Sequence, residues 1–146
     1  MTETKRFSLV KPSLQTPFHI DFTWWKQYDS NWRVYLISCL CSEHQQSLGN
    51  SGDDSMIDWI DPETAEVQQV DGLQHVLINH CAKLEDFVTN HTSLVDAVFR
   101  TLLANGNTPL TPEELSIRLG RPATTILMTL TGLQVYKGLR PVPRSN

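Results

Sequence analysis

Two short stretches of this chain carry side chains that are typical zinc ligands. Cys41 and His44 are separated by two residues, and His80 is followed directly by Cys81. Zinc in proteins is commonly bound by four sulfur and nitrogen ligands that come as two local pairs from separate elements. The spacing therefore predicts one structural zinc ion held by Cys41, His44, Cys81 and a fourth ligand. Either His75 or His80 could be that ligand, and the sequence leaves the choice open.

The same cysteines allow other interpretations. Cysteine is also a common small core residue, and Cys39 fits the apolar stripe of a helix, so we exclude it from the predicted site. A catalytic thiol at Cys41 or Cys81 would need a histidine base and an oxyanion-binding loop, and the sequence has no signature of that loop. Phosphate-binding, dinucleotide-binding and metalloprotease motifs are absent as well. We therefore expect a protein that is not an enzyme.

The composition is that of a soluble globular protein, with 40% hydrophobic and 19% charged residues in a chain of 146. No apolar run approaches the roughly 20 residues that a membrane-spanning helix needs. The first residues are polar and do not form the hydrophobic block of a secretory signal. The number of cysteines is odd, which argues against a disulfide framework. Together these features indicate a cytoplasmic location.

Charge is distributed unevenly along the chain, whose net charge is −4. Residues 1–110 contain seven basic and 14 acidic side chains, a balance of −7, and the acidic excess is concentrated between Asp53 and Asp71. Residues 111–146 contain five basic and two acidic side chains, a balance of +3. A basic C-terminal part is compatible with nucleic acid approaching that end of the molecule.

The first half of the chain predicts helices around one hairpin. Residues 1–17 are polar, contain two prolines and are expected to form an extended arm, and residues 18–91 are expected to form an aromatic helical part. A helix capped by Asp21 or Thr23 is expected to run to Tyr28. Apolar residues spaced as on one helix face predict a second helix over about 32–46. A β-hairpin over about 56–70 and a helix over 73–84 follow.

The last part of the chain, residues 92–146, has the clearest signals for where helices begin and end. A helix begins after Thr92 or Ser93 and ends at Asn105-Gly106. Thr111 is a helix N-cap followed by proline, and the next helix ends at Gly120, where a tight turn leads to a third helix that stops at Gly132. Alternating apolar residues on either side of Gly138, over residues 134–142, then predict a short two-stranded ribbon.

Residues 93–142 resemble the winged helix-turn-helix superfamily, in which three helices are followed by a ribbon called the wing. The resemblance implies a winged helix at the C-terminus. Together with the helices and the hairpin expected before it, we expect a mainly α fold with a small β-hairpin, in which the N-terminal aromatic helical part packs on the C-terminal winged helix. In DNA-binding members the third helix enters the major groove and the wing contacts phosphates. Carried over to this sequence, the third-helix contacts would come from Arg121, Thr124, Thr125, Met128 and Thr129, and the wing contacts from Lys137 and Arg140.

The third helix departs from the pattern of a sequence-reading helix. Its outward residues are threonine and methionine, whereas the bidentate contacts that specify guanine and adenine require arginine, lysine, asparagine or glutamine. We therefore expect a nucleic-acid-binding protein, with DNA as the first candidate and a regulatory or accessory role. The alternative is a protein-interaction module, stapled by zinc, inside a larger assembly.

Overall fold

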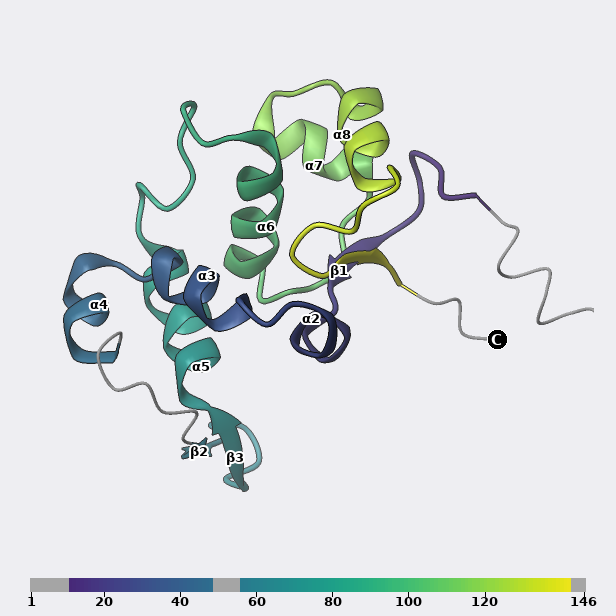
Figure 1. The fold of residues 1–146 in the computed structure, drawn as a ribbon. Helices are drawn as coiled ribbons and strands as arrows, with labels where there is room; N and C mark the ends of the chain where they lie inside the picture. The colour runs from purple at the N-terminus through teal and green to yellow at the C-terminus, as the bar shows by residue number, and fades with distance from the viewer. Residues whose placement is uncertain (1–10, 49–55, 143–146) are drawn as a thin grey trace, which may run out of the picture.

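A computed structural model describes residues 11–48 and 56–142. These residues are mainly helical and form two small antiparallel sheets, which confirms the predicted mainly α class with a small β-hairpin (Figure 1). The α-helices are α2 (Phe22–Tyr28), α3 (Trp32–Cys39), α4 (Ser42–Leu48), α5 (Gly72–Asn79), α6 (Leu94–Ala104), α7 (Pro112–Leu119) and α8 (Ala123–Leu130). A 3-10 helix, η1, spans Cys81–Lys83, and the strands are β1 (Phe18–Ile20), β2 (Met56–Ile60), β3 (Val67–Asp71) and β4 (Leu139–Pro141).

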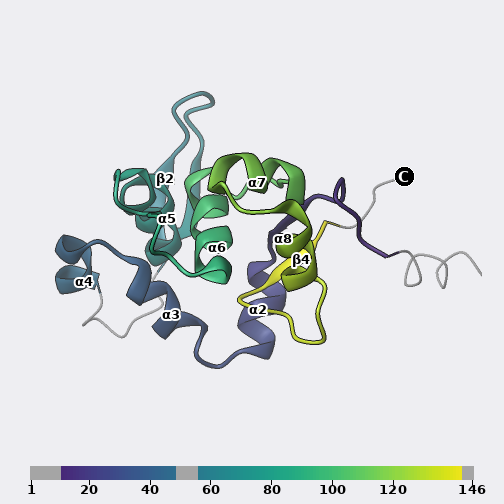
Figure 2. The ribbon, with the colours of Figure 1, turned by 90° about the horizontal axis from the view of Figure 1, so that it is seen from above.

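Helix α6 is the centre of the molecule. It lies between the group α3 to α5 on one side and the pair α7 and α8 on the other (Figure 2). Its inward side chains Val98, Phe99, Leu102 and Leu103 are almost completely buried. Phe99 meets the rings of Trp25 and Tyr35 edge to face, with centroids 5.4 and 5.1 Å apart. One apolar core therefore joins the aromatic helices to the C-terminal helices.

The helix ends in the C-terminal part form as their local sequence predicts. Thr111 caps α7 by accepting a hydrogen bond from the Glu114 N–H, and the Glu114 carboxylate accepts one from the Thr111 N–H. Gly120 ends α7 with φ +67°, a left-handed conformation that glycine adopts without a steric penalty. The tight turn between α7 and α8 is thereby confirmed.

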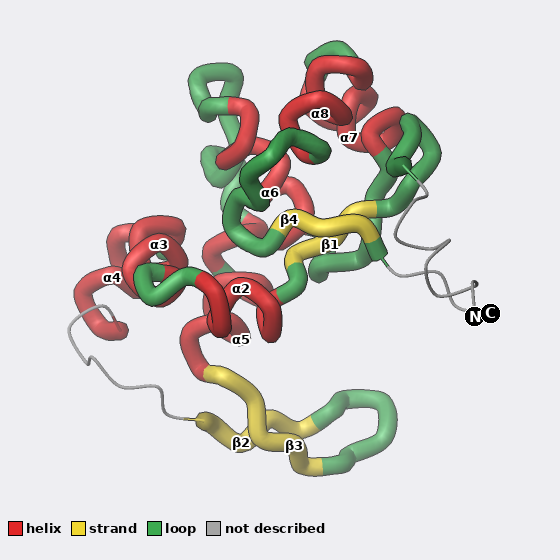
Figure 3. The backbone as a smooth tube through the Cα atoms, turned by 45° about the vertical axis from the view of Figure 1, so that its right-hand side comes forward, coloured by secondary structure: helices red, strands yellow, loops and turns green. Residues whose placement is uncertain are grey.

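The predicted two-stranded wing is wrong. Residues 134–137 form no strand, and β4 pairs with β1 from the other end of the chain (Figure 3). Phe18 lies opposite Pro141, and on its other side Phe18 exchanges two backbone hydrogen bonds with Leu110. Strand β1 occupies the position beside β4 that the hairpin partner would take, because its side chains Phe18 and Ile20 are buried in the common core.

Gly138 allows the chain to pass directly over α2. It has φ +72°, and a Cβ atom there would lie 2.8 Å from the Trp25 Cβ and 3.0 Å from the Asp21 carbonyl oxygen. We expect Gly138→Ala to destabilise the protein by about 2–4 kcal/mol, since it combines a left-handed alanine with overpacking against rigid atoms. Chemical denaturation measures the loss.

Gly106→Ala is the matched control for that prediction. Gly106 has φ +65°, but a Cβ there would meet no atom within 4 Å, so only the conformational cost of about 1–2 kcal/mol remains. Equal losses in the two variants would contradict the close packing of Gly138 on Trp25.

The hairpin predicted near residues 56–70 is confirmed as β2 and β3, paired from Met56 opposite Asp71 to Ile60 opposite Val67. It extends from the start of α5, on the side of the molecule opposite α7 and α8 (Figure 1). The Asp61 carboxylate accepts hydrogen bonds from the N–H groups of Glu63 and Thr64, which holds the turn.

Two predicted helices are shorter than expected. The helix over 32–46 is divided into α3 and α4, because Leu40 is extended (φ −65°, ψ 149°) and the Gln45 side-chain amide satisfies its carbonyl. The helix over 73–84 ends at Asn79, whose side-chain amide donates to the His75 carbonyl in competition with the backbone. Both interruptions lie directly beside the predicted metal ligands.

Candidate metal centre

The break between α3 and α4 positions the first pair of ligands. Cys41 lies at the start of α4, where its carbonyl accepts the Gln45 N–H at 2.9 Å. Residues three apart on a helix share one side. The His44 ring accordingly lies beside Cys41, and its Nδ1 is 3.2 Å from the Cys41 sulfur.

The junction between α5 and η1 positions the second pair. His80 leaves the helical conformation (φ −127°, ψ −65°), and Cys81 begins η1 with its side chain fully buried. The His80 and His44 rings meet edge to face with their centroids 4.5 Å apart. The Cys81 thiol donates to the Cys41 sulfur at 3.3 Å, and its sulfur lies 3.7 Å from Nδ1 of His44.

The two pairs therefore converge. The ligand atoms of Cys41, His44 and His80 all lie within 4.8 Å of one another and could hold a metal ion. His75, the alternative fourth ligand, is not in this group, and its ring lies 3.3 Å from the side-chain amide of Asn79. Of the five residues predicted from the sequence, Cys41, His44 and His80 form this group, which favours His80 over His75. Cys81 is not part of the group of three, but its sulfur contacts those of its members that lie on the other segment, Cys41 and His44.

The two sulfurs lie in different electrostatic environments. The hydrogen bond with His44 lowers the pKa of the Cys41 thiol, because it favours the thiolate. Burial raises the pKa of the Cys81 thiol to about 11, because desolvation penalises the charged form. Cys39 is buried in the core and, as expected, lies outside the ligand group.

A cavity of about 240 Å³ opens beside the two sulfurs. Its wall includes all three cysteines, together with Leu40 of the α3–α4 break and Phe87 and Arg100 from the far side. The Arg100 guanidinium lies over the Phe87 ring and donates to the Phe87 carbonyl oxygen. The sulfurs of Cys41 and Cys81 are thus next to a space larger than one water molecule, whose share of liquid volume is about 30 Å³.

The residues predicted to contact nucleic acid lie in the turn before α8, on α8 and in the segment after it. Thr124, Thr125 and Met128 are exposed, as the helix periodicity predicts. Thr129 donates its hydroxyl to the Thr125 carbonyl, and Arg121 donates to the carbonyl of Thr92 at 2.8 Å. The outward face of α8 is therefore uncharged, and the arginine at its start is bonded to the segment that precedes α6.

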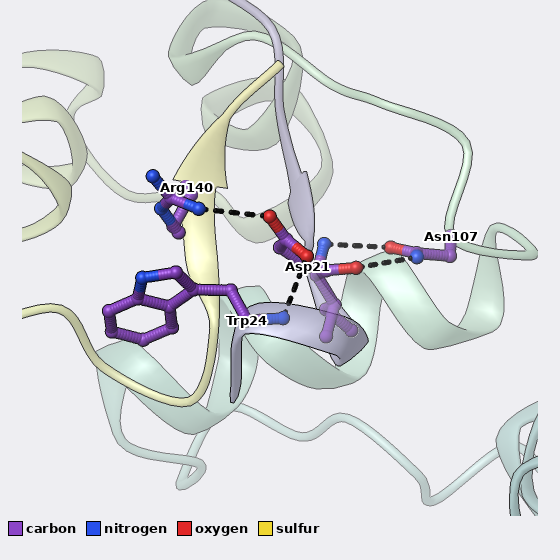
Figure 4. A network of polar contacts seen from close by, with 5 residues as sticks. Asp21, Trp24, Asn107 and Arg140 are labelled. Atoms are coloured by element: carbon purple, nitrogen blue, oxygen red, sulfur yellow. Dashed lines mark hydrogen bonds and ion pairs between the residues drawn. The ribbon is translucent and has the colours of Figure 1, made fainter. Parts of the chain in front are cut away.

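Both wing residues predicted to contact phosphates are engaged within the molecule. Arg140 forms an ion pair with Asp21 at 3.0 Å and lies over the Trp24 ring (Figure 4). The Lys137 ammonium lies 4.3 Å from the centroid of the Tyr35 ring. Both cations therefore already make contacts within the molecule, and these contacts would compete with a phosphate.

Sequence reasoning missed the polar network around Asp21. The Asp21 carboxylate caps α2 through the Trp24 N–H and also pairs with Arg140 (Figure 4). The Asn107 amide both accepts from the Ile20 N–H and donates to the Ile20 carbonyl, each at 2.9 Å. The cap at Asp21 is visible in the sequence, but no local pattern indicates a partner so distant in the chain.

Within residues 11–48 and 56–142, no helix combines the length and the apolar character needed to cross a membrane. Comparison of the chain with models of protein families, with curated proteins and with solved structures finds no match. The convergence of cysteine and histidine side chains from two separate segments is therefore the strongest indication of function in this chain.

Proposed function

We propose that the protein binds one structural Zn²⁺ through Cys41, His44, His80 and Cys81. With Zn–S bonds of about 2.3 Å and Zn–N bonds of about 2.0–2.1 Å, a tetrahedral site separates two sulfurs by about 3.8 Å and a sulfur from a nitrogen by about 3.6 Å. The corresponding separations are 3.3 Å between the sulfurs, and 3.2 and 3.7 Å from them to Nδ1 of His44. These values are close to the edges of such a tetrahedron, and they carry the proposal.

The ligand set favours zinc and a structural role. Two thiolates and two imidazoles form a set that zinc prefers, whereas calcium and magnesium prefer oxygen ligands. Four protein ligands leave no coordination position for a substrate, which is typical of structural sites. In this role the ion fastens α4 to the junction of α5 and η1, and η1 in turn packs against α6.

Metal analysis tests this proposal directly. Protein purified without added metal should contain about one equivalent of zinc, and Cys41→Ser should contain little. His75→Ala is the matched control and should keep the full equivalent, because His75 lies outside the ligand group. Less than about half an equivalent in the unmodified protein, together with no tetrahedral cobalt(II) spectrum on substitution, would exclude the site.

The zinc affinity should fall as the pH falls. Zinc binds thiolates, so binding must displace the proton of Cys81, whose pKa is raised to about 11 by burial, and part of the proton of Cys41, whose pKa is lowered by His44. Each displaced proton changes the apparent Kd tenfold per pH unit. We expect Kd to rise by about 10- to 100-fold for each pH unit below neutral, measured by competition with a chromophoric chelator. A Kd independent of pH would contradict thiolate ligation.

We further propose that the zinc-stapled fold acts without catalysis, as a protein-interaction module. The observation in favour is the surface of α7 and α8, where Ile117 and Met128 are 83% and 74% exposed. The outward residues of α8 carry no charge, and the partly exposed cations of Lys137 and Arg140 already contact Tyr35 and Asp21. Such a surface suits a protein partner better than a polyanion.

Nucleic-acid binding is the second candidate. It is favoured by the tight turn at Gly120 and by the exposure of Thr124 and Thr125 at the start of α8, the part of such a helix that approaches bases. If DNA binds there, fluorescence anisotropy with a labelled duplex should give a Kd that weakens steeply with salt. Thr124→Glu should weaken DNA binding relative to the unmodified protein at the same salt concentration, whereas Thr64→Glu in the distant hairpin should not. No binding at low salt would leave the protein partner as the only candidate.

A further inference from the structure

We infer that Cys41 and Cys81 form an oxidative modification site, at which a small hydroperoxide converts the zinc-bound thiolates into a disulfide and releases the ion. The inference rests on the zinc site proposed above. It starts from the 3.3 Å between the two sulfurs, which come from α4 and η1 and are 40 residues apart in the chain.

Disulfide formation requires only a small movement. A disulfide has an S–S bond of about 2.0 Å, so the sulfurs would have to approach by a little more than 1 Å. Cys41 lies at the break between α3 and α4, and Cys81 lies at the junction between α5 and η1. Both positions are at the start of a helix, where the backbone carbonyl accepts one hydrogen bond, from Gln45 and from Leu84 respectively. Rotation of the two side chains brings the sulfurs closer and leaves these backbone bonds in place.

An oxidant can reach these sulfurs. The cavity of about 240 Å³ has both Cys41 and Cys81 in its wall. Hydrogen peroxide is little larger than water, whose share of liquid volume is about 30 Å³. Cys41 is partly exposed, whereas Cys81 is completely buried. Attack therefore begins at Cys41, and Cys81 is placed to resolve the product.

The reaction balances with hydrogen peroxide as the only oxidant. The Cys41 thiolate attacks one peroxide oxygen and the O–O bond breaks, which gives the sulfenic acid and a hydroxide, and a proton from the buffer converts that hydroxide to one water. The Cys81 thiolate then attacks the Cys41 sulfur, the S–O bond breaks, and the second hydroxide leaves as water after protonation. Two thiolates lose two electrons in total, and one peroxide becomes two waters.

The ion leaves because its ligand set is halved. Zinc binds thiolates, and a disulfide sulfur carries no charge, so only His44 and His80 remain as ligands. Two imidazoles do not complete a tetrahedral site. Reduction of the disulfide by a thiol restores both thiolates and the site, so the modification is reversible. The proposed staple between α4 and η1 would then alternate between a zinc ion and a covalent bond.

Peroxide titration of the zinc-loaded full chain tests the inference. Release of zinc is followed with a chromophoric chelator, and the disulfide is mapped by mass spectrometry of non-reduced peptides. We expect one zinc released for each Cys41–Cys81 link formed, and recovery of bound zinc after treatment with a reductant and zinc. Cys39→Ala should behave in the same way, because Cys39 lies in the cavity wall but is not one of the four proposed ligands.

The outcomes separate this inference from the proposed zinc site. Bound zinc that survives peroxide, or zinc loss accompanied by links to Cys39 or by irreversible sulfinic acid at Cys41, would overturn the inference and leave the zinc site in place. A chain that binds no zinc before peroxide is added would overturn the zinc proposal and the inference together. A Cys41–Cys81 link formed at the same rate as zinc release is the only result that supports both.

Discussion

Cys41→Ser is expected to lose its zinc and to unfold at a temperature about 10 °C below that of the zinc-loaded protein. A ligand that binds only the folded chain stabilises it by about 4 kcal/mol when its free concentration is 1,000 times Kd, and for a chain of this size 1 kcal/mol corresponds to about 2–4 °C. Calorimetry with a fixed concentration of free zinc measures the change. The decrease in unfolding temperature is large because the variant loses all of the stabilisation that zinc binding gives to the folded chain.

Which helices are destabilised in Cys41→Ser tests the structure as closely as the overall loss of stability does. α4 is held at one end by the proposed ion, whereas α6 to α8 are fastened by the apolar core and by the Thr111–Glu114 capping box. Amide hydrogen exchange in Cys41→Ser should therefore lose protection in α4 and η1 and keep it in α6.

His75→Ala and chelation provide the controls for this prediction. His75→Ala keeps all four proposed ligands, so its zinc content and unfolding temperature should stay close to those of the unmodified protein. A chelator should lower the unfolding temperature of the unmodified protein to that of Cys41→Ser and should leave the variant unchanged. A variant that loses zinc without losing stability would show that the ion does not fasten the fold.

The sequence predicts what is decided within a few neighbouring residues. The cap at Asp21, the capping box of Thr111 and the left-handed Gly120 each depend on contacts within one turn of helix, so their residue types are sufficient to recognise them. The hairpin of β2 and β3 is also local, since its strands are joined by a turn that the Asp61 side chain holds.

Features that depend on distant segments could not be predicted in this way. The alternation around residues 134–142 correctly indicates a strand at β4, but alternation does not specify which strand pairs with it. β1 pairs with β4 because Phe18 and Ile20 bury their side chains in the core, a fact of tertiary structure. In the same way the sequence gives the positive charges of Lys137 and Arg140 but not their partners Tyr35 and Asp21.

The choice between His75 and His80 is the part of the metal centre that the sequence left open. An uninterrupted helix over 73–84 would point His80 and Cys81 about 100° apart, and only one of them could then face Cys41 easily. The helix ends at Asn79 instead, and the change of direction at His80 turns both side chains toward α4. The sequence shows that cysteine and histidine are the candidate ligands. Which histidine joins the site depends on where the helix before it ends.

Trp25→Ala is expected to destabilise the protein by about 3–5 kcal/mol, without changing its zinc content. Trp25 is 1% exposed, and its ring contacts those of Trp32, Tyr35 and Phe99 edge to face. Its indole N–H also donates to the Asp29 carboxylate at 2.9 Å. Truncation leaves a cavity among three rings held by two helices, α3 and α6, and these cannot close around it without breaking other contacts.

Tyr28→Ala is the matched control, because Tyr28 lies on the same helix, is 67% exposed and stacks on the Trp24 ring. It should cost about 1 kcal/mol, the value of one exposed aromatic pair. Urea denaturation of both variants at saturating zinc compares the losses, and similar values would mean that α2 is not part of the core.

Because Trp25 provides no metal ligand, Trp25→Ala should lower stability equally in α4 and α6, whereas Cys41→Ser should affect α4 first. Two variants that differ in this pattern would separate the contribution of the apolar core from that of the ion.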